Sequence, residues 1–110
     1  MSDRSVDRLR MVDRQVARRG VRDSAVLDAM RDVPREAFVP EDLQEFAYED
    51  CPLPIEAGQT ISQPYVVGLM IATAGIRSGA HVLEIGAGSG YAAAVLSRIA
   101  DHVCLSLIHI

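Results

Sequence analysis

A short apolar run that ends in three closely spaced glycines constrains this chain more than any other feature. Residues 80–85 (AHVLEI) are apolar and β-branched over the length of a strand, and GAGSG follows at residues 86–90. Residues 91–99 are typical of a helix, and residues 102–110 are again strand-like. A strand, a glycine turn and a helix open a βαβ unit, so the sequence predicts an α/β fold of the doubly wound, Rossmann-like kind.

The spacing of the glycines discriminates between ligands. A dinucleotide-binding turn requires glycine where this chain has Tyr91, and a bulky ring there would obstruct the close approach of helix and strand. The pattern present is Glu84-x-Gly86-x-Gly88-x-Gly90. Such glycines turn the backbone sharply and leave the helix N-terminus open to a polar or anionic group. The alternative is a tight strand-to-helix turn that binds nothing.

Glu84 is the second candidate ligand-binding feature. A carboxylate at the C-terminal end of a parallel strand lies at the crevice where such sheets bind ligands. There it can meet the ammonium group of a cofactor, directly or through water. The alternative is an acid that caps a helix or pairs with Arg77 or Arg98.

The loop at residues 60–64 (TISQP) carries a candidate active-site hydroxyl at Ser62. A serine just ahead of a helix is commonly its N-cap, and that is the structural alternative. Neither a local Asp–His pair nor a G-x-S-x-G turn is present to make Ser62 a nucleophile. Its hydroxyl can still position a carboxylate by hydrogen bonding.

The first half of the chain is predicted to be helical. Val6, Leu9, Val12 and Val16 form an apolar stripe at helical spacing, and Gly20 is suited to end that helix. A second helix is expected after a cap at Asp23 or Ser24, with its apolar face made of Val26, Leu27 and Met30. A short third helix is expected to begin at Pro40 and run toward Phe46.

The middle of the chain is predicted to change from extended to helical. The two prolines in residues 50–55 (DCPLPI) indicate extended chain, and a polar loop follows at residues 58–64. The next helix is expected to end at Gly75. Its predicted apolar face consists of Val66, Val67, Met70, Ile71 and Ala74.

Composition excludes several classes of protein. The 110 residues include 11 Lys+Arg and 15 Asp+Glu, a net charge of −4, with 49% hydrophobic and 24% charged residues. This profile is typical of a globular protein, and the net acidity argues against non-specific nucleic-acid binding. The most apolar window, residues 66–76, is shorter than the about 20 residues that a membrane span needs.

The cysteines and histidines indicate neither a disulfide framework nor a metal site. Cys51 and Cys104 have no CxxC spacing, and His81, His102 and His109 share no ligand spacing. The charged N-terminus lacks the apolar core of a signal peptide. We therefore expect a cytoplasmic protein with no metal.

Six segments in order carry a resemblance to a known family. The chain resembles the protein-L-isoaspartate O-methyltransferases over nearly all of residues 8–103, and the TISxP loop is its most specific signal. The segments are MVxxQ at 11–15, RGVxD at 19–23, VPRExFVP at 33–40, AYxDxPLPI at 47–55, GQTISQPY at 58–65 and VLEIGxGSGY at 82–91.

The resemblance implies a reaction, a fold and a set of site residues. The fold would be that of class I S-adenosylmethionine-dependent methyltransferases. The reaction would transfer a methyl group from S-adenosyl-L-methionine to the carboxylate of L-isoaspartyl or D-aspartyl residues, and the ester would then collapse to a succinimide on the way to aspartate. Ser62 would orient that carboxylate. The cofactor-binding residues would be Thr60, Ile61, Glu84, Gly86, Ala87, Gly88 and Gly90.

The resemblance also implies partners. Isoaspartyl-containing proteins and peptides would be the substrates, with no nucleic acid and no membrane involved. The full-length protein is expected to be a monomer. Two rival functions remain open: another class I methyltransferase, and a fragment that binds S-adenosyl-L-methionine without catalysis.

The chain departs from the family pattern near its end. In the family, the strand after the glycine-turn helix ends in an acid that binds the cofactor ribose, but that position falls near Leu107 and no carboxylate is present. Residues 105–110 (LSLIHI) match the translation of a common sequencing-library adaptor. We therefore expect this tail to be non-native, and the chain to be an N-terminal fragment that is inactive alone.

This gives three expected parts. Residues 1–57 would form a helical region and an extended segment. Residues 58–104 would form the substrate loop and the start of the cofactor-binding domain. Residues 105–110 would be the non-native tail.

Overall fold

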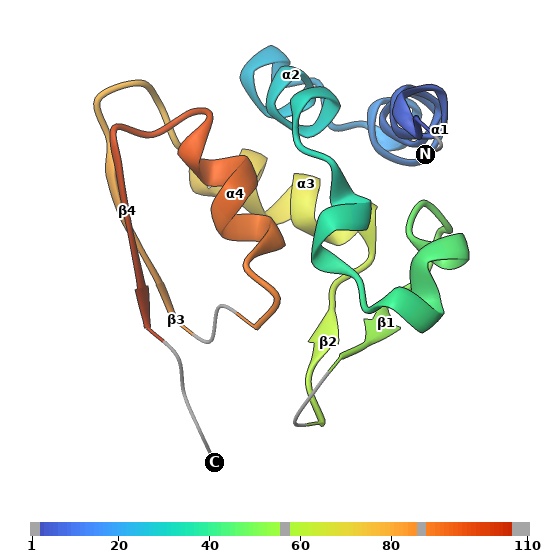
Figure 1. Cartoon of the computed structure of the whole chain (residues 1–110). Helices are drawn as coiled ribbons and strands as arrows, with labels where there is room; N and C mark the ends of the chain where they lie inside the picture. Colours follow the sequence, from blue (N-terminus) through green and yellow to red (C-terminus); the bar gives the residue numbers. More distant parts are fainter. Residues whose placement is uncertain (1–2, 56–57, 86–87, 107–110) are drawn as a thin grey trace.

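The computed structural model describes residues 3–55, 58–85 and 88–106. Its first half is helical and its last part is a βαβ unit, with a two-strand pair and a long helix between them (Figure 1). The elements in chain order are α1 (Ser5–Met11), η1 (Val12–Val16), η2 (Ala17–Arg19), α2 (Ser24–Asp32), η3 (Arg35–Phe38), η4 (Glu41–Phe46), β1 (Leu53–Pro54), β2 (Thr60–Ile61), α3 (Pro64–Ala74), β3 (His81–Ile85), α4 (Tyr91–Ser97) and β4 (His102–Ser106).

The first helical stretch ends as predicted, but only the second half of its predicted apolar stripe is buried. Gly20 terminates it with a φ of 108°, a left-handed conformation that favours glycine. The predicted stripe is wrong at its start, since Val6 is 62% exposed and Leu9 is 50% exposed. Val12 and Val16 are buried as predicted, together with Met11. η1 is a π-helical segment, and its wider turn breaks the regular spacing that the stripe assumed.

α2 follows its sequence signals closely. The Asp23 side chain accepts a hydrogen bond from the Ala25 backbone N–H at 3.0 Å, which confirms the predicted N-cap. Val26 and Met30 are buried as predicted, whereas Leu27 is only partly buried. The helix ends at Asp32, because the chain becomes extended before Pro34.

Two 3₁₀ helices connect α2 to the strand pair. η4 corresponds to the predicted third helix, with Pro40 as its N-cap residue and Phe46 as its last residue. η3 was not predicted, and it follows Pro34 directly. Residues 3–50, which include α1, α2 and these short helices, are called the helical region below.

β1 and β2 form an antiparallel pair between the helical region and α3. Leu53 lies opposite Ile61, and both side chains are buried, while Pro54 lies opposite Thr60 and both are exposed. This alternation is typical of a strand pair with one covered face. The predicted extended segment is therefore confirmed, whereas the predicted polar loop contains a short strand.

α3 runs from Pro64 to Ala74 and is terminated by Gly75, as predicted, although Pro64 was expected in the preceding loop and the apolar face is partly different. Val67 and Ile71 are buried, whereas Met70 is 64% exposed. Ala74 is exposed as well. Almost every residue of this helix is apolar, so the sequence pattern does not distinguish its faces.

Gly68 lets α3 approach the helical region closely. A Cβ atom at this position would lie 2.8 Å from Val16 Cγ1 and 3.2 Å from Met30 Sδ, closer than normal packing permits. η1 and α2 therefore pack directly against the α3 backbone, and this contact lies at the centre of the buried core.

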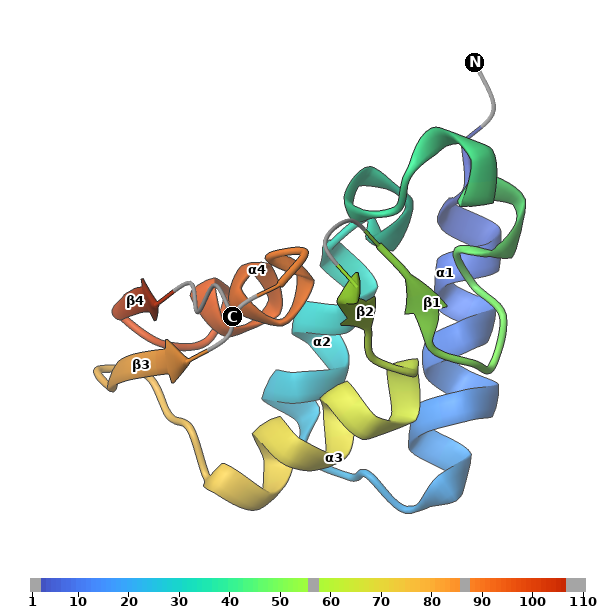
Figure 2. The same cartoon turned by 90° about the horizontal axis from the view of Figure 1, so that it is seen from below.

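β3, α4 and β4 form the predicted βαβ unit. β3 and β4 pair in parallel, with Glu84 opposite Leu105 and Ile85 opposite Ser106. α4 lies between this two-stranded sheet and α2 (Figure 2). The opposite face of the sheet is open, and Leu83 and Ile85 on it are each 64% exposed.

The predicted tail begins inside β4. Leu105 and Ser106 pair with β3, while residues 107–110 lie outside the described residues. No helix within the described ranges combines the length and the apolar character needed to cross a membrane.

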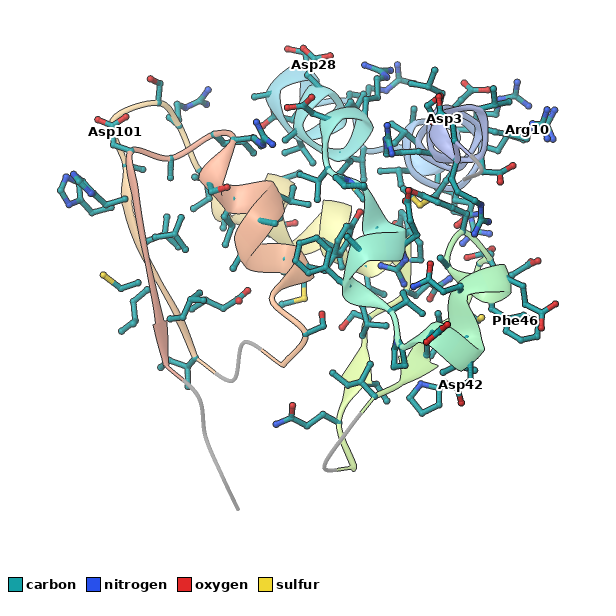
Figure 3. The ribbon with its side chains drawn as sticks, in the orientation of Figure 1. Asp3, Arg10, Asp28, Asp42, Phe46 and Asp101 are labelled. Atoms are coloured by element: carbon teal, nitrogen blue, oxygen red, sulfur yellow. The ribbon has the colours of Figure 1, made fainter. Side chains whose placement is uncertain are left out.

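Several charged side chains of the helical region lie on its outer surface. Arg10 and Asp28 project from it, away from the rest of the molecule (Figure 3). Arg31 forms an ion pair with Asp28 at 2.9 Å, and Arg18 forms one with Asp13 at 3.1 Å. Interleaved charges of this kind are typical of a solvated helical surface.

Candidate functional site

A cleft of about 370 Å³ lies where the strand pair, α3 and the βαβ unit meet. This volume falls within the range of small-molecule sites. One end is formed by the loop that carries Ser62, and the walls come from α3, β3 and the first turns of α4. The lining residues are Thr60, Ile61, Ser62, Val67, Met70, Ile71, Ala74, Ile76, Val82, Leu83, Glu84, Ile85, Gly88, Ser89, Tyr91, Ala92 and Leu96.

The structure brings most of the predicted site residues to this one cleft. They arrive from two segments more than 20 residues apart: β2 with its following loop, and β3 with its following turn. Gly90 is not on the cleft wall; it is the N-cap residue of α4, with a φ of 85°. Predicted residues Gly86 and Ala87 lie outside the described residues. The predicted residues that line the cleft are Thr60, Ile61, Ser62, Glu84 and Gly88.

Glu84 carries a buried carboxylate oxygen without a partner. Its Oε1 atom is out of contact with solvent and makes no hydrogen bond with the residues that the structure describes. Burial raises the pKa of this carboxyl group. Among the described residues, neither Arg77 nor Arg98 forms an ion pair with it, and Arg98 instead pairs with Asp32 at 3.1 Å. The ion pair of Glu84 with Arg77 or Arg98, one of the alternatives considered for this residue, is therefore not formed among the described residues.

The residues around Glu84 fit the cofactor that the sequence implies. A buried acceptor without a donor is costly, and an ammonium group brought into the cleft would satisfy it. Gly88 has a φ of 56° and Gly90 one of 85°, so both turn positions favour glycine. Ser89 Oγ accepts a hydrogen bond from the Tyr91 backbone N–H at 3.2 Å, which orders the start of α4.

Ser62 is exposed at the end of the cleft. The N-cap alternative for this residue is wrong, because Gln63 is the N-cap residue of α3 and no side chain caps that helix. Thr60 is exposed beside it, whereas the Ile61 side chain is buried in the core. Ile61 therefore anchors the loop while the two hydroxyl residues remain open to the cleft.

Arg35 is a buried residue behind this loop that the sequence analysis did not assign to the site. It is 0% exposed. Its Nε donates a hydrogen bond to the Ala47 carbonyl at 2.7 Å, and its Nη2 donates one to the Ser62 carbonyl at 2.9 Å. Burial lowers the pKa of Arg35, while Tyr91 opposes this effect. The available signal was a charged residue between Val33 and Phe38, two apolar positions.

Tyr91 joins Arg35 to the start of α4. The Arg35 Cζ atom lies 4.9 Å from the centroid of the Tyr91 ring, within cation–π distance. The same ring meets Phe38 edge-on, with centroids 5.8 Å apart. Burial raises the pKa of Tyr91, while the Arg35 charge opposes this effect. The ring that excluded a dinucleotide turn is thus part of the core between the helical region and α4.

Tyr48 orders the chain on the other side of Arg35. The Arg35 backbone N–H donates to the Tyr48 hydroxyl at 3.2 Å, and that hydroxyl donates to a Glu36 carboxylate oxygen. Burial and the Glu36 hydrogen bond raise the pKa of Tyr48 to about 12. Its ring is buried as expected for a packing residue, and its hydroxyl additionally ties η3 to the segment that follows η4.

His81 and His102 lie on neighbouring strands, away from the cleft lining. Their ring centroids are 4.5 Å apart, and both residues are exposed. His109 lies outside the described residues. Within the described part of the chain, no group of three or more potential metal ligands is present.

Comparison with known proteins gives a consistent match. The family model for protein-L-isoaspartate(D-aspartate) O-methyltransferase matches residues 7–110. A protein-L-isoaspartate O-methyltransferase of Methylorubrum extorquens (strain PA1) is 62% identical over 101 residues, which are 92% of this chain and 44% of the relative. One from Rhodopseudomonas palustris (strain ATCC BAA-98 / CGA009) is 62% identical over 93 residues, 84% of this chain and 43% of the relative.

Solved structures show the same likeness in three dimensions. A protein-L-isoaspartate O-methyltransferase structure has a TM-score of 0.75 at 33% identity, covering 89% of this chain and 32% of that one. A Plasmodium falciparum protein described as a beta-aspartate methyltransferase, in complex with S-adenosyl-L-homocysteine, has a TM-score of 0.67 at 27% identity, covering 82% and 40%. The chain thus spans less than half the length of its matched relatives.

Proposed function

The chain belongs to the protein-L-isoaspartate(D-aspartate) O-methyltransferase family, and from that premise we propose that its protein methylates damaged proteins. The methyl group would pass from S-adenosyl-L-methionine to the free carboxylate of an L-isoaspartyl or D-aspartyl residue. The observation that carries this proposal is the cleft itself. It has the Ser62 loop at one end and the unpartnered Glu84 oxygen on another wall.

The proposed chemistry asks little of the side chains beyond placement. When bound, S-adenosyl-L-methionine supplies an electrophilic methyl group on its sulfonium sulfur. A substrate carboxylate oxygen forms the new bond to that methyl carbon, and the electrons of the broken C–S bond remain on sulfur. The carboxylate is already an anion, so no general base is needed, and rate acceleration comes from alignment and desolvation.

The predicted site residues that the structure describes then have proposed tasks. Ser62 orients the substrate carboxylate through its hydroxyl, and Thr60 and Ile61 lie against cofactor and substrate. Glu84 accepts a hydrogen bond from the cofactor amino group, while Gly88 and Gly90 keep the turn free of side chains. Gly86 and Ala87 belong to the same proposed turn but lie outside the described residues.

The test is a transfer assay with a protein of full family length. We suggest a chimeric protein in which residues 1–104 of this chain precede the unmatched remainder of the Methylorubrum extorquens relative. Labelled S-adenosyl-L-methionine is offered with an isoaspartyl peptide, the same peptide with normal aspartate, and a small-molecule carboxylate. We expect label only in the isoaspartyl peptide. No transfer to that peptide by a folded chimera would refute the proposal.

The other outcomes identify the rivals. Label on the small molecule alone would indicate another class I methyltransferase. Binding of S-adenosyl-L-homocysteine without transfer to any acceptor would indicate a non-catalytic binding protein. We expect residues 1–110 alone to be inactive, because a single βαβ unit gives a parallel sheet too few strands to bury both faces.

The division of the chain and its cellular setting belong to the same proposal. The parts would be residues 1–57, residues 58–104 and a non-native tail at residues 105–110; an uninterrupted native frame through Ile110 on resequencing would contradict the tail. The partners would be isoaspartyl-containing proteins and peptides, without nucleic acid. We propose a cytoplasmic protein that is a monomer at full length, a setting consistent with the free thiols of Cys51 and Cys104.

A further inference from the structure

We infer that Arg35 is a positioning residue for the substrate loop, and this inference rests on the proposed methyl transfer. Its guanidinium holds the Ser62 main chain against the helical region and beside the start of α4. Arg35 does not line the cleft and is not expected to touch substrate. It would act through Ser62, whose hydroxyl and carbonyl belong to the same residue.

The two hydrogen bonds of Arg35 join segments that are far apart in the chain. Nε reaches the Ala47 carbonyl at 2.7 Å, after η4, and Nη2 reaches the Ser62 carbonyl at 2.9 Å, after β2. A planar guanidinium presents these donors at a fixed separation, which a lysine ammonium cannot reproduce. The side chain therefore sets the position of the Ser62 backbone relative to the helical region.

The surroundings of Arg35 favour positioning over an ordinary ion pair. In the part of the chain that the structure describes, no carboxylate forms a salt bridge with it, although it is fully buried. Two of its nitrogens donate to backbone carbonyls and its Cζ atom lies 4.9 Å from the centroid of the Tyr91 ring, while Nη1 is buried without a hydrogen-bond partner among the described residues. Ser62 and Tyr91 both line the cleft, whereas Ala47 belongs to the helical region.

Tyr91 extends this link to the cofactor side of the cleft. It is the first residue of α4 and directly follows Gly90, so its ring position is tied to the glycine turn. One guanidinium thus contacts both the loop proposed to hold substrate and the helix proposed to receive cofactor. Because a misplacement of about 1 Å can lower a rate roughly 100-fold, loss of this contact should reduce transfer while both ligands still bind.

The test compares Arg35→Lys with Arg31→Lys in the chimeric protein. Arg31 is a suitable control because its side chain is 42% exposed and pairs only with Asp28 on the surface. Rates are normalised to the fraction of protein that binds S-adenosyl-L-homocysteine. We expect Arg35→Lys to lower kcat/KM for an isoaspartyl peptide at least tenfold, with the Kd for S-adenosyl-L-homocysteine changed less than twofold. Arg31→Lys should leave both unchanged.

The normalised rate separates positioning from a merely structural role. If Arg35→Lys lowers only the competent fraction and its melting temperature, while kcat/KM per competent molecule matches the parent, the inference is overturned. If the unmodified chimera shows no transfer, the proposed function fails first, whatever Arg35 does. The two failures are therefore distinguishable.

A second measurement needs no substitution, in case Arg35→Lys does not fold. The ¹⁵Nε–Hε resonance of Arg35 is followed by NMR in the unmodified chimera as an isoaspartyl peptide is added. We expect it to shift with the isoaspartyl peptide and not with the matching aspartyl peptide, while the Arg31 resonance stays in place. Equal responses of the two arginines, or to the two peptides, would contradict the inference.

Discussion

The helical region and the βαβ unit differ in how they bury their apolar side chains. In the helical region, Met11, Val16 and Met30 are fully enclosed between α2, η1 and α3. In the βαβ unit, α4 covers one face of the sheet, while Leu83 and Ile85 on the other face of β3 are each 64% exposed. The cleft lies between α3, which packs on the helical region, and β3 of the βαβ unit. The wall at α3 is therefore held by a closed core, whereas the wall at β3 belongs to a sheet that is covered on one face only.

The first prediction tests that contrast directly, by truncating one buried and one exposed apolar side chain of similar size. Met30→Ala should lower the free energy of unfolding of the helical region by about 2–5 kcal/mol, because it leaves a cavity in a closed core. Leu83→Ala in the same chain should cost much less, because its side chain is already 64% exposed. Hydrogen exchange measured separately over each region gives the two values.

The chimeric protein sharpens the same comparison. A parallel sheet needs cover on both faces, so the added chain should bury Leu83. Leu83→Ala should then become nearly as destabilising as Met30→Ala. An equally large effect of Leu83→Ala in the 110-residue chain would break the comparison, since it would mean that this face is already covered in solution.

The second prediction concerns the ligand affinity of the βαβ unit. Glu84→Gln in the chimera should weaken binding of S-adenosyl-L-homocysteine roughly 10- to 100-fold, because hydrogen bonds to charged groups are worth about 1.5–3 kcal/mol. Isothermal titration calorimetry provides the measurement. Glu41→Gln, at an exposed position in η4, is the matched control and should bind as the parent does. Equal affinities of the two variants would remove Glu84 from the proposed site.

The third prediction asks how much one helix cap contributes to the better-packed region. Asp23→Ala should destabilise the helical region by about 1 kcal/mol, because the Ala25 backbone N–H loses its acceptor. Asp28→Ala, which removes only a surface ion pair with Arg31, should cost less than about 0.5 kcal/mol. Urea unfolding of both variants decides between these values. A similar loss in the two would argue against the cap.

The fourth and smallest prediction is a pH dependence located in the βαβ unit. Burial raises the folded-state pKa of Glu84 above its ordinary value of 4.5, so the folded protein binds this proton more tightly than the unfolded chain does. Glu84 therefore destabilises the fold increasingly as the pH rises above 4.5. Glu84→Gln should be the more stable form at pH 7, and its advantage should vanish below about pH 4. The melting temperatures of Glu84→Gln and the parent are compared from pH 4 to 8. A difference that does not change with pH would mean that the carboxylate is well solvated, and it would contradict the prediction.

The sequence predicted the order of the elements around the cleft better than it predicted the packing. The parallel strands on either side of α4 follow from local patterns, whereas the expectation that Ser62 and Glu84 serve one site came from the family resemblance. The buried face of the first helical stretch does not follow from the local sequence pattern, because a π-helical segment changes the spacing between Leu9 and Val16. The exposure of Met70 could not be predicted from the sequence either, because apolar residues occupy every face of its helix.

Arg35 shows a different limit of sequence reasoning. Its neighbours in the chain identify a charged residue between apolar positions, but they contain no information about the Ser62 carbonyl 27 residues away. The bond exists only once β2 has paired with β1 and η3 has packed beside them. Residues that act through distant backbone carbonyls leave no spacing pattern, so they are found only when the fold is in hand.

Gly68 has a consequence for how this cleft can change over time. Because Gly68 has no side chain, α3 packs directly against the helical region, and α3 also forms a wall of the cleft. Adding one methyl group there would shift α3 without altering any residue that faces a ligand. The shape of the cleft therefore depends on the distance between α3 and the helical region at Gly68, away from the cleft. The ligand selectivity of the cleft could therefore be changed by substitutions inside the core that touch no ligand.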